Sequence, residues 1–139
     1  MNPQRYLIPA VLDALTQGGP LPGGALVTEF QPGGASAYVL VTQPTVADLP
    51  GTAACRMWSA TLLLDCVTLS EPESISAVLC DELADAVLGR LQGAALPMGG
   101  GLQLSGRATL ELLTSGADFD TEQIDIHRYL RMRFTIYTS

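Results

Sequence analysis

Lysine is absent from this 139-residue chain, and histidine occurs only once, as His127. The absence of lysine excludes Schiff-base chemistry and the lysine-containing phosphate loop. A single histidine excludes a multi-histidine metal site within one chain. The chain also lacks a GxSxG elbow and a GxGxxG motif between a strand and a helix. We therefore predict that the protein is not an enzyme and has no catalytic, cofactor-binding or metal site.

Charge is scarce as well. Charged residues make up 15% of the chain and hydrophobic residues 47%. The seven basic residues, all arginines, are outnumbered by 14 acidic ones, which gives a net charge of −7. Such a chain offers no broad cationic surface for nucleic-acid phosphates. The high apolar fraction in so small a chain predicts that other subunits cover part of its surface.

The cysteines and the hydrophobic runs indicate a protein made in a reducing compartment. Cys55, Cys66 and Cys80 cannot all pair within one chain, and no CxxC motif occurs. We interpret them as reduced thiols that act as small hydrophobic residues. No signal peptide is recognised, and the longest apolar run is far shorter than a membrane span. We expect no contact with a membrane.

The first third of the chain predicts a helix followed by a hairpin. A helix is expected over Pro3–Gln17, with Asn2 as its N-cap and one apolar residue in every turn. Two strands are expected over Ala25–Gln31 and Ala37–Gln43. Between them, the turn sequence Pro32-Gly33-Gly34 indicates a β-hairpin.

The middle of the chain predicts a long loop, a central strand and a helix. The segment Gln43–Ala54 contains two prolines and is expected to be a loop that contacts a partner, with Asp48 and Leu49 at its centre. Met57–Leu69 is apolar at nearly every position, which predicts a strand covered on both faces. A capping box that begins at Ser70 predicts a helix that runs to Leu91, with an apolar stripe from Ile75 onward.

The final third predicts further strands. Leu102–Leu104 and Arg107–Thr114 are strand candidates, and the acidic segment Ser115–Gln123 is expected to be a turn. The last strand is expected to start at Ile124 or Asp125 and to end at Tyr137. Helices packed on a mainly antiparallel sheet would bury all these apolar stripes, so we predict one α+β domain over residues 1–139.

Alternation in the last strand separates two sets of side chains. Leu130, Met132, Phe134 and Ile136 share one face, while the opposite face carries Tyr129, Arg131, Arg133 and Tyr137. Tyrosine and arginine are typical of protein interfaces, but the same composition also suits a solvent-facing side of a sheet. We interpret His127, at the start of this strand, as an interface residue.

The densest group of carboxylates lies just before that strand. Asp118, Asp120 and Glu122 alternate along the chain and offer oxygen ligands to a hard cation. The segment lacks the central glycine and the terminal glutamate of an EF-hand loop. We interpret it as a solvated acidic loop.

The order of these elements resembles the tail terminator proteins of long-tailed bacteriophages, which include the minor tail protein U of lambda-like phages. The matching features are the opening helix, two short strands, the long loop, the strand that begins Arg56-Met57-Trp58, the helix Ser70–Leu91 and the closing strand His127–Tyr137. The resemblance covers nearly the whole chain and rests on size and element order, because this family has no invariant motif to compare.

The resemblance implies a structural virion protein of the tail or neck, assembled in the host cytoplasm. Such proteins form a hexameric ring that caps the head-proximal end of the tail tube, stops its polymerisation and presents a surface to the head connector. The resemblance implies that Gln43–Ala54 contacts the tube or a neighbouring subunit. It also implies that Arg131 and Arg133 pair with Asp118 or Asp120 of the next subunit. DNA would pass through an acidic lumen without specific binding.

Two other classes of protein remain open. A head-closure protein or another connector of the same particle has a similar size and also forms rings, although such proteins usually contain more barrel strands. A small bacterial ligand-binding domain would instead show a pocket with convergent polar groups and would form a dimer.

Overall fold

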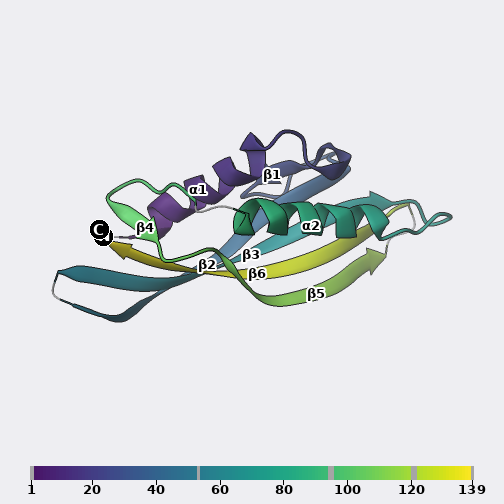
Figure 1. Ribbon diagram of the computed structural model, residues 1–139. Helices are drawn as coiled ribbons and strands as arrows, with labels where there is room; N and C mark the ends of the chain where they lie inside the picture. The colour runs from purple at the N-terminus through teal and green to yellow at the C-terminus, as the bar shows by residue number, and fades with distance from the viewer. Residues whose placement is uncertain (1, 53, 94–95, 120–121, 139) are drawn as a thin grey trace.

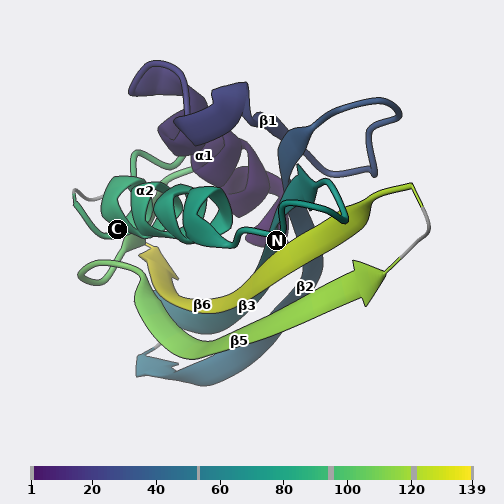
Figure 2. The same cartoon turned by 90° about the vertical axis from the view of Figure 1, so that its right-hand side faces the viewer.

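The computed structural model describes residues 2–52, 54–93, 96–119 and 122–138, which form one sheet with two α-helices on the same face (Figures 1 and 2). This arrangement confirms the predicted α+β class. The elements are α1 (Gln4–Gln17), a 3-10 turn η1 (Pro22–Gly24), β1 (Leu26–Thr28), β2 (Ala37–Thr52), β3 (Cys55–Ser70), α2 (Val78–Gln92), β4 (Leu102–Leu104), β5 (Thr109–Phe119) and β6 (Ile124–Thr138).

The sheet has six strands in the order β1-β2-β3-β6, and β4 and β5 both pair with the far edge of β6. All neighbouring strands are antiparallel except β1 and β2, which are parallel. The sheet is therefore mixed and mostly antiparallel, as predicted. The hairpin end of its two longest strands, β2 and β3, projects beyond the helices and is here called the arm (Figure 1).

The core lies between the helices and one face of the sheet. Side chains of β3 and β6 that point to the helices are buried in alternation, and each helix contributes one apolar stripe. The largest of these buried side chains are Leu7, Leu15, Leu62, Leu64, Leu83, Leu91, Leu130, Met132, Phe134 and Ile136. The predicted opening helix is confirmed, and the backbone N–H of Gln4 donates to Oδ1 of Asn2 at 3.1 Å.

The prediction of a loop over Gln43–Ala54 is wrong, because β2 continues to Thr52 and pairs with β3 along most of this segment. Both prolines are compatible with a strand in this position. Pro44 and Pro50 lie at the two register irregularities of β2, and beyond Leu40 no described strand pairs with the edge of β2 that faces away from β3. Proline is tolerated at bulges and on free edges because no partner there needs its missing N–H.

The predicted hairpin between the first two strands is also wrong. β1 covers only Leu26–Thr28 and runs parallel to β2, so residues 29–36 must carry the chain back before β2 begins. The Pro32-Gly33-Gly34 turn lies inside this connection, where Gly34 has a φ of 75°. β2 instead forms its hairpin with β3.

Helix α2 begins at Val78, eight positions after the predicted cap, Ser70. The capping box fails because β3 continues to Ser70, which pairs with Ile124. The Ser70 hydroxyl instead donates to the carbonyl of Ser74 and accepts from the N–H of Ser76. As a result Ile75 lies before the helix and is exposed, contrary to the predicted stripe.

The face of the sheet turned away from the helices, here called the bare face, has no helix packed on it among the described residues (Figure 2). The prediction that the central strand is covered on both sides is therefore only partly right. Met57, Ser59, Thr61 and Leu63 of β3 point to the bare face and are partly exposed, and only the Asp65–Val67 end of this face is buried. The acidic segment Ser115–Gln123 was also wrongly predicted as a turn, since β5 continues to Phe119.

Candidate interaction surface

The bare face carries the four aromatic and basic side chains that the sequence placed together. Tyr129, Arg131, Arg133 and Tyr137 alternate along β6 with the buried Leu130, Met132, Phe134 and Ile136. The strand register puts these four residues opposite Asp65, Leu63, Thr61 and Met57 of β3. Their common face is thereby confirmed, and it is an open surface of the molecule.

The two arginines of this face differ in their partners. Nε of Arg133 lies 3.3 Å from Oε1 of Glu111, the residue at the bulge where β5 shifts register. Both side chains are partly exposed, so this ion pair contributes little to stability. Arg131 is exposed and has no ion pair within the described part of the chain. Arg131 is thus a free cation between Leu63 of β3 and Leu112 of β5.

The two tyrosines contact their own chain. The hydroxyl of Tyr137 donates to Oε1 of Gln103 on β4 at 2.7 Å. The ring of Tyr129 stacks on His127 with 5.3 Å between centroids. Partial burial is the main cause that raises the pKa of Tyr129 above its usual value, and the nearby charge of Asp65 raises it further. Both tyrosines nevertheless remain partly exposed on the bare face.

A buried polar cluster closes one end of the bare face. Nδ1 of His127 lies 2.9 Å and 3.0 Å from the two carboxylate oxygens of Asp65, and Nε2 lies 3.1 Å from Oδ2 of Asp118. His127 is 8% exposed and Asp65 9% exposed. His127 is therefore buried within its own chain on this side of the sheet, and its role at an interface stays a prediction. Burial raises the pKa of Asp65, although the hydrogen bond from His127 opposes this shift.

This cluster has the atoms of a cation site but is already satisfied by its own hydrogen bonds. Three possible ligand atoms, one from each of Asp118, Asp125 and His127, lie within 4.8 Å of one another. Nδ1 of His127 contacts Asp65 and Nε2 contacts Asp118, so both ring nitrogens already have a carboxylate partner. Asp118 and Asp125 also face each other across β5 and β6, where two carboxylates repel. Asp120, the remaining predicted acidic partner, lies outside the described residues.

The predicted contact residues Asp48 and Leu49 lie in the projecting arm. Asp48 is exposed and lies 3.8 Å from the guanidinium of Arg56, which stacks over the ring of Trp58 at 5.0 Å. These contacts link the two strands of the arm on its helix side. Opposite these residues, Trp58 and Met57 of β3 also pair with β6, so only the tip of the arm beyond Leu49 is two-stranded. Its projection from the core therefore suits a segment that meets another surface.

The sequence did not single out Asp65 or Arg90. Asp65 is an acidic residue within an otherwise apolar strand, and this break in the pattern was the one sequence signal that could have pointed to it. Arg90 of α2 donates to the backbone carbonyls of Leu15, Gly18, Gly19 and Pro20, so it provides hydrogen-bond partners for carbonyls at the C-terminal end of α1.

Cys66 and Cys80 are buried free thiols, and burial raises the pKa of the Cys66 thiol.

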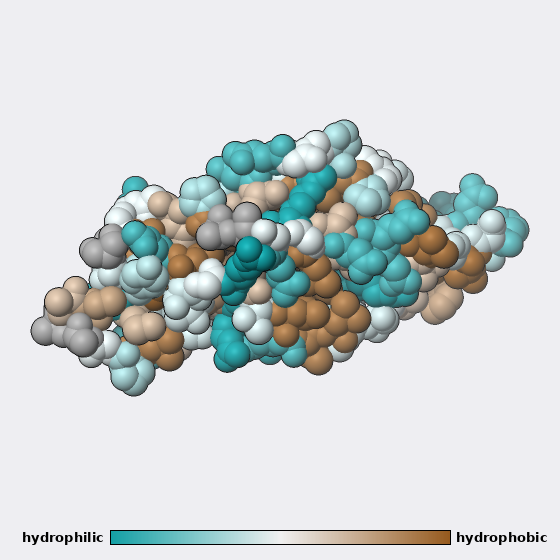
Figure 3. All heavy atoms as spheres, viewed as in Figure 1, coloured by the Kyte–Doolittle hydropathy of each residue, from teal (hydrophilic) through white to brown (hydrophobic). Residues whose placement is uncertain are grey.

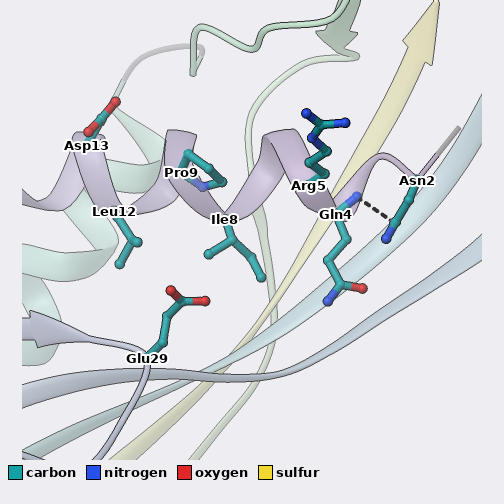
Figure 4. Close-up of a pocket in the computed structure, with 8 residues that line it drawn as sticks. All are labelled: Asn2, Gln4, Arg5, Ile8, Pro9, Leu12, Asp13 and Glu29. Carbon is teal, nitrogen blue, oxygen red and sulfur yellow. Dashed lines mark hydrogen bonds between the residues drawn. The ribbon is translucent and has the colours of Figure 1, made fainter.

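The hollows of the described surface are open depressions that do not enclose a ligand. One of them lies between the outer side of α1 and the loop after β1, with Glu29 facing Ile8 and Leu12 (Figure 4). It is a shallow, open depression of about 410 Å³. A small-molecule site usually encloses its ligand and places several polar groups around it. This geometry does not favour a ligand-binding domain.

Comparison with known proteins gives a likeness among solved structures. No family model matches the chain, and no curated protein matches it. Among solved structures, it is similar to a chain of the "Virion of native gene transfer agent (GTA) particle", with a TM-score of 0.61 and 21% sequence identity. The match covers 95% of this chain and 93% of that one. None of the described helices is long and apolar enough to cross a membrane. At this identity, the likeness establishes that the two chains share a fold.

Proposed function

We propose that this chain is a structural component of a phage-type virion and acts as a tail terminator, one copy in a hexameric ring at the head-proximal end of the tail tube. The observation that carries the proposal is the shared fold with a chain of a virion particle, which extends over nearly the full length of both chains. The resemblance in element order to tail terminators supports the same assignment.

The architecture supports a role in assembly. A ring closes through contacts in which one side of a subunit meets a different side of the next. The sheet has one bare face, two unpaired edges within the described residues and a projecting arm, so several surfaces are free to meet neighbours. A structural ring component needs such surfaces and does not need a reactive centre.

The proposed contacts use the residues already described. The arm, with Asp48 and Leu49, reaches the tail tube or a neighbouring copy. Arg131, which has no partner among the described residues, pairs with a carboxylate of the next copy, and Arg133 and Asp118 lie beside the same contact. The net charge of −7 per copy favours an acidic lumen, through which DNA passes without adhering. The head-side surface of the ring meets a connector protein.

The proposal is tested by the mass and the shape of the purified protein. Mass is measured over a range of concentrations, alone and with purified tail tubes, and the largest species is imaged by negative-stain electron microscopy. We expect a closed ring with a central hole, seated on one end of each tube. A protein that stays monomeric and does not bind tube ends would contradict the proposal, and a compact dimer without a hole would favour a ligand-binding domain.

A head-closure protein or another connector is the second candidate. The similarity to a chain of a virion particle is equally compatible with a protein on the head side and with one on the tail side. The same experiment separates the two. A terminator ring binds the ends of tail tubes that lack heads, whereas a head-side connector binds emptied capsids and leaves tube ends uncovered.

A further inference from the structure

The polar cluster that closes one end of the bare face has complete hydrogen bonds but an unbalanced charge. Three carboxyl groups, those of Asp65, Asp118 and Asp125, surround the single imidazole of His127. Within the described part of the chain, no arginine forms an ion pair with any of the three. Asp118 and Asp125 also lie directly opposite each other on β5 and β6, where like charges are unfavourable. The cluster therefore favours the binding of a cation.

The imidazole is held in the orientation of a metal ligand. Both carboxylate oxygens of Asp65 contact Nδ1 of His127, which places a proton on this nitrogen and fixes the ring. A carboxylate behind the non-coordinating nitrogen is the usual outer contact of a metal-bound histidine. Nε2 then faces Oδ2 of Asp118 at 3.1 Å, and its lone pair would repel this oxygen unless a positive charge lies with it. That charge is either a second ring proton or a metal ion.

A buried hydroxyl without a partner lies beside the cluster. Tyr38 of β2 is 6% exposed, and its hydroxyl forms no hydrogen bond within the described residues. Burial is the main cause that raises the pKa of Tyr38, and the charges of the same three carboxyl groups raise it further, so the hydroxyl lies near them. Tyr38 and Asp125 line one open hollow of about 360 Å³, which gives a small ion access to the cluster. A hydrated ion would supply the partner that this hydroxyl lacks.

We propose that Asp118, Asp125 and Nε2 of His127 bind one divalent transition-metal ion, for which Zn²⁺ is the best fit. An imidazole with two carboxylates is a donor set for zinc, whereas Mg²⁺ and Ca²⁺ prefer oxygen ligands alone. Ligand atoms of one zinc ion lie about 3–3.5 Å apart, so the 3.1 Å between Nε2 and Oδ2 already suits the ion. All three possible ligand atoms lie within 4.8 Å of one another, so small rotations of the two aspartates complete the site.

The ion would fasten an exposed edge strand. Within the described residues β5 pairs only with β6, and Leu112, Leu113 and Phe119 are exposed along it. Figure 3 shows hydrophobic residues gathered over this part of the molecule. Asp118 lies at the end of β5, whereas Asp125 and His127 belong to β6, so one ion ties this end to its neighbour. Binding to the folded chain should raise its stability as the ion concentration rises. This inference goes beyond the proposed function and does not depend on it.

The test titrates Zn²⁺ into the untagged, metal-free protein by isothermal titration calorimetry, and melting temperature is followed by circular dichroism. Both are done in a Cys55→Ser background, because Cys55 is a partly exposed thiol that could bind zinc itself. We expect one ion per chain, a dissociation constant in the micromolar range or tighter, and a melting temperature that rises with the Zn²⁺ concentration.

Two variants and a matched control locate the ion. Asp118→Asn and Asp125→Asn each remove one charged ligand that is not buried, so each should fold and should weaken Zn²⁺ binding roughly ten-fold or more. Asp85→Asn removes an exposed carboxylate from α2 and should leave binding unchanged. Circular dichroism without metal confirms that all three variants are folded.

Three results would overturn the proposal. If Zn²⁺ neither binds nor raises the melting temperature, a second ring proton supplies the charge and the cluster is not a metal site. If Asp118→Asn and Asp125→Asn bind Zn²⁺ as tightly as the parent protein, the ion lies elsewhere. If Ca²⁺ or Mg²⁺ binds more tightly than Zn²⁺ in the same titration, the proposed class of metal is wrong.

Discussion

Neighbouring residues of β6 lie in opposite surroundings. Leu130, Met132 and Phe134 face the helices and are buried, whereas Arg131 and Arg133 face outward from the bare face. The helix-covered face consists almost entirely of apolar side chains, while the bare face combines arginine, tyrosine and threonine with a few half-exposed leucines. This contrast indicates that the covered face stabilises the fold, and that the bare face and the free edges are available for contacts with other chains.

The largest effect is expected from a change on the covered face. Phe134→Ala removes a side chain that is 1% exposed, so it should lower the free energy of unfolding by about 3–5 kcal/mol. Urea denaturation followed by circular dichroism measures the change. Thr135→Ala, at the adjacent position that faces outward, is the matched control and should change stability far less. Equal losses at the two positions would show that both faces are packed.

An intermediate effect is expected at the buried end of the bare face. Asp65→Ala removes the acceptor of the His127 Nδ1 proton and leaves a buried donor without a partner, which should cost about 1–3 kcal/mol. Asp65→Asn retains an acceptor oxygen and should cost less. If Asp65→Ala is as stable as the unmodified protein in urea denaturation, the cluster does not contribute to the fold.

The same cluster predicts a dependence of stability on pH. Burial raises the pKa of Asp65 above its ordinary value of 3.8, so the folded state binds this proton more tightly than the unfolded chain does. The stability that Asp65 contributes through this shift is complete below pH 3.8 and is lost as the pH rises through the folded-state pKa. Urea denaturation at a series of pH values, compared with Asp65→Asn, should show this loss only in the unmodified protein. If the free energy of unfolding changes with pH in the same way in both proteins, the predicted rise in the pKa of Asp65 is contradicted.

The smallest effect on stability is expected at the exposed arginine. Arg131→Ala removes no contact of the described fold, so the free energy of unfolding should change by no more than about 0.5 kcal/mol. Assembly of the ring should nevertheless weaken, which sedimentation would show. Arg131→Ala thus separates the roles of the two faces, and a clear loss of stability without a loss of assembly would reverse the assignment.

The parts of the fold that follow from local patterns were predicted from the sequence. The opening helix and the two faces of β6 were correct because their apolar residues repeat with the period of a helix or a strand. The arm was missed because Pro44 and Pro50 indicate a loop, and only the tertiary position of β2 at a free edge makes them tolerable. The start of α2 was misplaced because the pairing of Ser70 with Ile124 extends β3 through the expected cap.

The candidate surface was predicted less completely. The sequence showed that Arg131 and Arg133 share a face, since two residues apart on a strand point the same way. It could not show that Asp65 holds His127, because 62 positions separate these residues and only the β3–β6 register brings them together. Nor could the sequence distinguish the exposed leucines of β5 from buried ones, because their exposure depends on what packs against each face of this edge strand.

The central claim, that this chain terminates a tail tube, is tested most directly by the growth of the tube. Purified tail-tube protein is allowed to polymerise with and without this protein, and tube lengths and ends are recorded by electron microscopy. The account predicts that added protein caps one end of each tube with a ring and halts elongation. Tubes that grow equally long with uncovered ends in the presence of this protein would contradict the account.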